Sequence, residues 1–209
     1  MRLANTEPFC ALFASRFLGY SDKTGEGGFF MIPDIGTRVV YGTSGVCTVV
    51  DMREEDFGAG KRIYYVLRPL AKHSVSTDIF VPADNERLLA KIKNVLTPKE
   101  IYELIEIIPE EHMDWIDDNR ARSIKFESVI SEGDRHELVA LTKATYNRKH
   151  ELSKQGKKLS ITDERFMRAA EKMLFEEFAI ALEIEQEEVI PFITKQIKCR
   201  EKKMSEKAD

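Results

Sequence analysis

Cysteine is scarce in this chain, and its positions exclude two kinds of site. The three cysteines, Cys10, Cys47 and Cys199, lie far apart and form neither a disulfide framework nor a CxxC metal-binding motif. The four histidines are also scattered and lack the HExxH spacing of a zinc enzyme. We therefore expect no disulfide-stapled fold and no metal site.

Long hydrophobic runs are absent as well. No apolar run approaches the ~20 residues that a membrane-spanning helix requires. The segment "PFCALFASRFLGY" is interrupted by Arg16 and lacks the features of a signal peptide. We expect a soluble, cytoplasmic protein without a membrane partner. We interpret residues 1–30 as a disordered or weakly ordered extension, or as an artefact of an upstream start codon with the working protein beginning at Met31.

Motifs that bind nucleotides or perform catalysis are missing too. The sequence contains no GxxxxGK[ST] phosphate-binding loop and no GxGxxG between a strand and a helix. Its acidic pairs lie in charged helical segments, whereas general acid–base catalysis needs carboxylates that converge in a pocket. We expect a protein that is not an enzyme and has no cofactor.

The charge of the chain is unevenly distributed. The net charge is -4, yet residues 115–172 contain 13 Lys and Arg against 10 Asp and Glu. Screening limits the reach of a distant charge to about 8–10 Å. A locally basic segment in an acidic protein can therefore still bind phosphates.

The first part of the chain has the pattern of short β-strands. Four β-branched or alternating segments are separated by Gly and Pro: "GTRVVYG", "GVCTVVDM", "KRIYYVLRPL" and "STDIFVP". Short strands at intervals of about 8–12 residues predict a small antiparallel barrel. A five-stranded SH3-like or Tudor-like barrel fits this length.

The period changes to that of helices after residue 82. The segment "ADNERLLAKIKNV" predicts a first helix, and Thr97 with Glu100 forms a capping box for a second. A third helix, with Ile124 among its apolar residues, is predicted to end at Gly133. Further helices are expected from Asp134 to Gly156, from a cap at Ser160 or Thr162 to Leu182, and in "EEVIPFITKQI".

These patterns predict an α+β fold, in which a small antiparallel β-barrel of the Tudor or SH3-like type precedes an all-helical domain. We place the barrel at residues 31–85, the helical domain at residues 86–198 and a charged tail at residues 199–209.

The single tryptophan, Trp115, lies in the polar stretch "EEHMDWIDDNRARSIKF". Most tryptophans are largely buried, so one interpretation is a ring that fills a seam between domains. The other is an exposed wedge beside a polyanion, since Arg120, Arg122 and Lys125 follow closely. Composition alone leaves both interpretations open.

Two regions together resemble the CarD-like family of bacterial transcription regulators. The first is "IPDIGTRVVYGTSGVCTVVDM" with "YYVL" and "IFVPADN" downstream. The second is Trp115 followed by "SEGDRHELVALTKATYNRKHELSKQGKKLSITDERFMRAAEKMLFEEFAIAL". The resemblance covers about residues 31–195 and depends on the combination, because no single motif in it is diagnostic.

The resemblance implies a function and a set of site residues. The Tudor-like domain would bind the RNA polymerase β subunit, and the helical domain would bind promoter DNA at the upstream edge of the melted region. Trp115 would then be a wedge in the minor groove. Apolar side chains can insert there between base steps and partly unstack them. The resemblance, with the basic charge of the segment, gives these DNA-binding candidates: Trp115, Arg120, Arg122, Lys125, Lys143, Arg148, Lys149, Lys157, Lys158 and Arg165.

The polymerase-binding positions implied by the resemblance fall at Glu55, Ile79, Phe80 and Val81, beside a sheet edge that could pair with a partner strand. We expect a monomer that stabilises the open promoter complex. The alternative is a protein–protein adaptor whose helical domain binds a partner and does not bind DNA.

Overall fold

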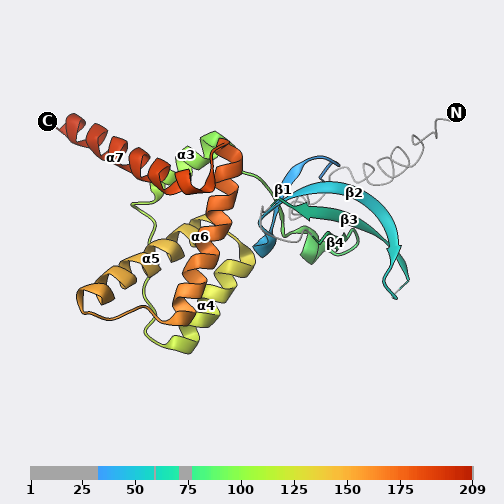
Figure 1. Cartoon of the computed structure of the whole chain (residues 1–209), viewed down its shortest axis with the longest axis horizontal. Helices are drawn as coiled ribbons and strands as arrows, with labels where there is room; N and C mark the ends of the chain where they lie inside the picture. Colours follow the sequence, from blue (N-terminus) through green and yellow to red (C-terminus); the bar gives the residue numbers. More distant parts are fainter. Residues whose placement is uncertain (1–32, 59, 71–76, 209) are drawn as a thin grey trace, which may run out of the picture. The chain divides into compact units, whose positions relative to one another are not determined.

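The computed structural model describes residues 33–58, 60–70 and 77–208, which form an antiparallel sheet followed by a set of helices (Figure 1). The predicted extension at residues 1–30 and the start at Met31 lie outside the described residues. Every element below belongs to one compact unit.

The sheet has five antiparallel strands in the order β4-β3-β2-β1-β5. Their bounds are β1 Arg38–Tyr41, β2 Val46–Asp56, β3 Lys61–Pro69, β4 Ile79–Pro82 and β5 Ile92–Asn94. The four predicted strand segments are thus confirmed. The turn "GTSG" between the first two becomes a short 3-10 helix, η1 (Gly42–Ser44), closed by Gly45 at φ 71°, a conformation that favours glycine.

One face of the sheet carries a compact apolar core. Tyr65, Leu67 and Val81 alternate with residues of the opposite face and are almost fully buried. Val39, Cys47, Val49 and Ile92 complete the cluster. The β2–β3 register shifts between Val49 and Asp51, an irregularity of the kind that a β-bulge produces.

The fifth strand comes from a segment for which the sequence predicted a helix. Only Glu86–Leu89 is helical (α2), and Ile92–Asn94 then pairs antiparallel with β1. The pairing buries Ile92 in the sheet core, which overrides the local helical pattern. The sheet therefore extends past the predicted boundary at residue 85. Within the described residues β4 and β5 do not pair with each other, so the sheet is open and a closed barrel is not confirmed.

The second part of the chain is helical, as predicted. The main helices are α3 Pro98–Ile107, α4 Asn119–Glu132, α5 Arg135–Lys154, α6 Ile161–Leu182 and α7 Val189–Ala208, with a 3-10 turn, η2, at Gln186–Glu188. The segment predicted as a charged tail at residues 199–209 continues α7 as far as Ala208. No helix in the described part of the chain is long and apolar enough to cross a membrane.

The helix ends follow from local side-chain chemistry. The predicted capping box is present: Thr97 accepts the Glu100 amide, and the Glu100 carboxylate accepts the Thr97 amide. Asp134 caps α5 and Ser160, rather than Thr162, caps α6. Gly133 ends α4 in the left-handed conformation at φ 61°, where a side chain would be strained.

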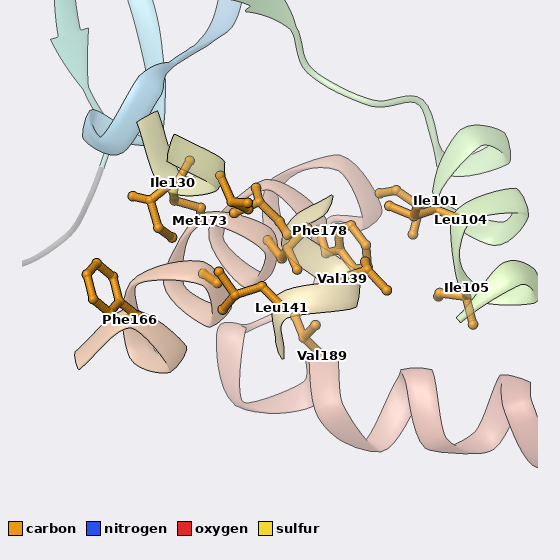
Figure 2. Packing of buried hydrophobic residues seen from close by; sticks show 14 of the residues in the cluster. Ile101, Leu104, Ile105, Ile130, Val139, Leu141, Phe166, Met173, Phe178 and Val189 are labelled. Carbon is orange, nitrogen blue, oxygen red and sulfur yellow. The ribbon is translucent and has the colours of Figure 1, made fainter. Parts of the chain in front are cut away.

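The helices enclose a second apolar core, part of which Figure 2 shows. Phe126, Leu141 and Phe178 come from three different helices and are almost fully buried. Ile124, which we expected on the apolar face of α4, is instead 62% exposed. The buried residues Phe126, Val129 and Ile130 are spaced by three and one, so the inner face of α4 leaves Ile124 outside.

We predict that Phe178→Ala lowers the free energy of unfolding by ~3–5 kcal/mol, because it empties a buried aromatic site. The matched change on the exposed side of α4, Ile124→Ala, is expected to alter it by no more than about 0.5 kcal/mol. Urea unfolding followed by circular dichroism measures both. A large loss for Ile124→Ala would contradict the assignment of the α4 faces.

Candidate functional site

Trp115 lies in the irregular segment between α3 and α4, three residues before the α4 cap at Asp118. Its ring is half-buried and packs against the helical core, with its edge toward Phe126 at a centroid distance of 6.2 Å. The tryptophan is thus part of the helical core and also reaches the surface. Neither of the two original interpretations describes it completely.

Two guanidinium groups lie over the Trp115 ring. The Arg122 guanidinium carbon is 4.5 Å from the ring centroid and that of Arg148 is 5.4 Å from it. Both distances are within the range of a cation–π interaction, in which the negative face of the ring attracts a cation. The two cations therefore hold the ring in place and cover part of its surface.

Arg122 is 5% exposed and belongs to a buried network. Its Nε and Nη2 donate to the two carboxylate oxygens of Asp163, both at 2.9 Å. Nη1 donates to the Ile116 carbonyl at 2.6 Å, and Nη2 also donates to Asn119 Oδ1 at 2.7 Å. In this fold the guanidinium is buried and fully engaged, so Arg122 has a structural role. The DNA contact that we predicted for Arg122 stays a prediction.

Asp163 stays ionised at the centre of this network. Burial alone would raise the pKa of its carboxyl group. The hydrogen bonds from Arg122 and from the Ser160 hydroxyl outweigh burial, together with the Arg122 charge, and the pKa is lowered below its ordinary value. The same carboxylate thus accepts from the α6 cap and from α4, which joins the starts of these two helices.

Lys143 also has a structural role, and the DNA contact that we predicted for it stays a prediction. Its ammonium group donates to the carbonyl oxygens of Ile108, Pro109 and Glu111 at 3.0, 2.6 and 2.8 Å. A lysine ammonium has three donors, so these carbonyls use all of them. Lys143 fixes the start of the segment that carries Trp115, while Arg122 fixes its end.

Two histidine–carboxylate contacts add to the same segment. His136 Nδ1 lies 2.8 Å from Glu111 Oε1, and His112 Nε2 lies 2.8 Å from Asp114 Oδ1. Beside them is a cleft of about 170 Å³. Its lining includes Trp115, Lys143, Asn147, Arg148 and Glu151.

The other predicted DNA-binding cations are at the surface, with different degrees of engagement. Lys125 forms an ion pair with Glu137 at 2.8 Å, and Arg148 forms one with Glu151 at 3.2 Å. Arg165 is exposed and lies over the Phe166 ring at 5.5 Å. The remaining four candidates are exposed as well: Arg120, Lys149, Lys157 and Lys158.

Several of these cations lie at one end of the helical part. Figure 1 shows α4 and α6 beginning at the same end, where the Arg122–Asp163 ion pair joins them. Arg120 is in the first turn of α4, and Lys157 and Lys158 immediately precede the start of α6. Fold and ion pair together therefore place exposed cations at the same end of the helical part as the exposed carboxylates of Asp117 and Asp118.

The sheet has a separate surface feature, an aromatic cluster of Phe57, Tyr64 and Phe80. The ring of Phe57 lies 5.2 Å from those of both Tyr64 and Phe80. Arg53 lies over Phe80 at 5.5 Å and forms an ion pair with Glu55 at 2.8 Å. Two predicted polymerase-binding residues, Glu55 and Phe80, thus meet on one face of the sheet. Phe57, which is 60% exposed, was not among the predicted residues.

The other two predicted residues of this group lie on the core side of β4. Val81 is 0% exposed and Ile79 packs against the sheet core. The side chain of Val81 therefore points into the sheet core, because side chains alternate between faces along a strand. The polymerase contact that we predicted at Val81 stays a prediction. Its burial is what turns the neighbouring Phe80 toward the opposite face.

Among the described strands, β4 lies at one edge of the sheet. The Ala83 amide donates to the Ile63 carbonyl at 2.9 Å, and hydrogen-bonded pairs alternate along an antiparallel ladder. In this register Phe80 and Pro82 direct their backbone groups away from β3. Pro82 has no amide hydrogen, so the amide and carbonyl of Phe80 are the main groups offered to another strand.

The described residues contain no group of three or more His, Cys, Asp and Glu side chains that could hold a metal ion. Cys47 is buried, and burial together with the nearby Glu176 carboxylate raises the pKa of its thiol to about 11. The thiol therefore stays protonated at neutral pH and packs as a core side chain.

Residues 34–93 match the family model of the CarD-like/TRCF RID domain. The residues that form the sheet are thus similar to a CarD-like/TRCF RID domain. The match begins before β1 and ends within β5, so the RID domain and the sheet have nearly the same limits. The resemblance predicted from the sequence is confirmed for these residues, and it connects the chain with transcription-related proteins that interact with RNA polymerase. The comparison with curated proteins found no match.

Some residues of the two surfaces were not predicted, because their contacts are with residues far away in the sequence. In the RID domain, the only local signal for Phe57 is a large aromatic residue in the charged and Gly-rich "REEDFGAG" turn. In the helical part, Asp163 and Glu151 are separated from the Trp115 segment by more than thirty residues, and no spacing rule connects them.

We predict that Arg122→Ala lowers the free energy of unfolding at neutral pH by ~3–5 kcal/mol, because it leaves the buried Asp163 unpaired. The lowered pKa of Asp163 also has a consequence for pH. The unfolded chain binds a proton at this carboxyl group before the folded chain does, so the contribution of Asp163 is complete above its ordinary pKa of 3.8 and is lost as pH falls below it.

The measurement is urea unfolding of the wild type and of Asp163→Asn between pH 7 and pH 3. The stability of the wild type should fall more steeply below about pH 4, since the variant lacks the titrating group. Parallel pH profiles for the two proteins would contradict this assignment.

Proposed function

We propose that the chain is a transcription regulator that binds the RNA polymerase β subunit through its RID domain and promoter DNA through its helical part. In this proposal it binds DNA at the upstream edge of the melted region and stabilises the open complex. It acts as a monomer, by binding alone and without catalysis. A Tudor-like arrangement of the sheet is consistent with this role.

The observation that carries the polymerase half is the RID match together with the edge strand β4. Main-chain groups at an open edge can extend a sheet with a strand of the partner, and exposed side chains beside the edge then give specificity. The aromatic cluster of Phe57, Tyr64 and Phe80 lies on the face next to this edge. Aromatic residues and arginine are enriched in protein–protein interfaces, and Arg53 lies over Phe80.

The DNA half is supported by the fixed position of Trp115. Lys143 and Arg122 anchor the two ends of its segment. A side chain that is held before binding loses little conformational freedom when it inserts between base steps. The exposed cations at the starts of α4 and α6 are then the phosphate contacts, which fix position without reading sequence.

The adaptor alternative is favoured by one specific observation. Four of the predicted DNA-binding cations are engaged within the protein, either with carbonyl groups or with carboxylates: Arg122, Lys125, Lys143 and Arg148. An adaptor would bind its partner with a weak dependence on salt, whereas each phosphate contact lowers log K by about 0.9 per unit of log salt on duplex DNA.

The proposal as a whole is tested by purifying the chain from its native cell with whatever binds it, and by footprinting a promoter with the recovered complex. Co-purification of RNA polymerase and protection at the upstream edge of the melted region support it. Recovery of another protein without polymerase or DNA would support the adaptor.

We predict that Phe57→Asp abolishes binding to RNA polymerase, because it places a negative charge in the aromatic cluster. The RID domain should stay folded, because the Phe57 ring is exposed. Ile35→Asp is the matched control, since Ile35 is 62% exposed and Phe57 is 60% exposed on the same domain. Pull-down of polymerase and circular dichroism are measured together. Equal binding by the two variants would place the interface elsewhere.

We predict that Lys157→Gln together with Lys158→Gln weakens binding to duplex DNA equally for all sequences. The slope of log K against log salt should also fall by up to about 1.8 if each lysine contacts one phosphate. The control is Lys195→Gln with Lys198→Gln, two exposed positions on α7. Unchanged affinity and slope in the first variant, or equal losses in both, would remove Lys157 and Lys158 from the interface.

A further inference from the structure

The two guanidinium groups over Trp115 are held very differently. Arg122 is 5% exposed and is fixed by the buried carboxylate of Asp163. The Arg148 side chain is 34% exposed and has one ion pair, with Glu151 at 3.2 Å on the same helix. One contact on the ring is therefore permanent, and the other can be exchanged.

The difference matters because a guanidinium group over the ring occupies space that a stacking base would need. Arg122 cannot leave, since its departure would strand a buried charge at Asp163. Breaking an exposed ion pair such as Arg148–Glu151 shifts an equilibrium by no more than about fivefold. The cleft beside Trp115, which Asn147, Arg148 and Glu151 help to line, leaves room for the Arg148 side chain to move.

We propose that Arg148 is a removable cover of Trp115 and that Glu151 is the positioning residue that holds it there. A DNA phosphate competes with Glu151 for the Arg148 guanidinium. When the phosphate wins, the guanidinium leaves the ring, and the uncovered indole faces the groove while Arg122 continues to support it. One residue thus links phosphate binding to exposure of the wedge. This inference rests on the proposed binding of promoter DNA.

The inference also explains why an acidic residue stands next to a DNA-binding ring. Glu151 lines the same cleft as Arg148 and lies three residues after it on α5. A carboxylate at this position lowers affinity for a polyanion, but it keeps the apolar ring covered in the free protein. The carboxylate therefore sets the fraction of molecules in which Trp115 is exposed before DNA arrives.

The first arm of the experiment uses the free protein. Trp115 is the only tryptophan, so its fluorescence reports on the cover directly. Glu151→Gln should increase acrylamide quenching, because the ratio of uncovered to covered molecules rises by up to about fivefold when an exposed ion pair is lost. Arg148→Ala should increase it at least as much, because the covering side chain is gone. Glu164→Gln is the matched control: it breaks the exposed Arg168–Glu164 pair on α6 at 3.0 Å and should leave quenching unchanged.

The second arm adds a DNA duplex with a short unpaired bubble. Glu151→Gln should bind it up to about fivefold more tightly than the wild type, since the competing carboxylate is lost. Arg148→Ala should bind more weakly, with a salt slope smaller by about 0.9. Quenching that is unchanged in both Glu151→Gln and Arg148→Ala would overturn the cover. If quenching changes as expected but no variant binds the bubble, the proposed DNA binding fails, and the phosphate exchange fails with it.

Discussion

The buried ion pair between Arg122 and Asp163 is the interaction on which the helical part depends. It joins α4 to α6, and the same guanidinium holds the Ile116 carbonyl and covers Trp115. A buried pair of this kind is costly to break because each charge has left water. The ion pair therefore fixes the starts of α4 and α6 together with the orientation of the Trp115 ring. Exposed lysines and an arginine lie at the same end of the helical part.

Positive charge in this chain has two uses that the sequence does not distinguish. Arg122 pairs with the buried Asp163 carboxylate and Lys143 donates to backbone carbonyls, whereas Lys157 and Lys158 are exposed. Local sequence cannot separate them, because the partners of the first two come from other parts of the chain. The structural cations hold a half-buried ring in position, and the exposed cations are the ones available for the proposed phosphate contacts.

Particular elements explain which parts of the fold were predictable. Strands β1 to β4 and the caps at Thr97, Asp134 and Ser160 depend on residues a few positions apart, and the sequence predicted them. Strand β5 depends on pairing with β1 about fifty residues earlier, and it was predicted as helix. The exposure of Ile124 and the burial of Val81 likewise depend on which face other elements cover. For the candidate site, the sequence drew attention to Trp115, but not to the support that Asp163 gives it through Arg122.

By itself, the sequence determined the order of a strand-rich and a helix-rich part and the ends of most helices, because these follow from short-range periodicity and capping chemistry. It also determined the similarity of the sheet to a known domain, because that similarity lies in a pattern of residues along the chain. Only the tertiary structure decided which cations face solvent, which face of β4 carries Phe80, and how Trp115 is covered. These properties depend on contacts between residues far apart in the chain. Such contacts determine whether a charge is paired within the fold or left for a partner.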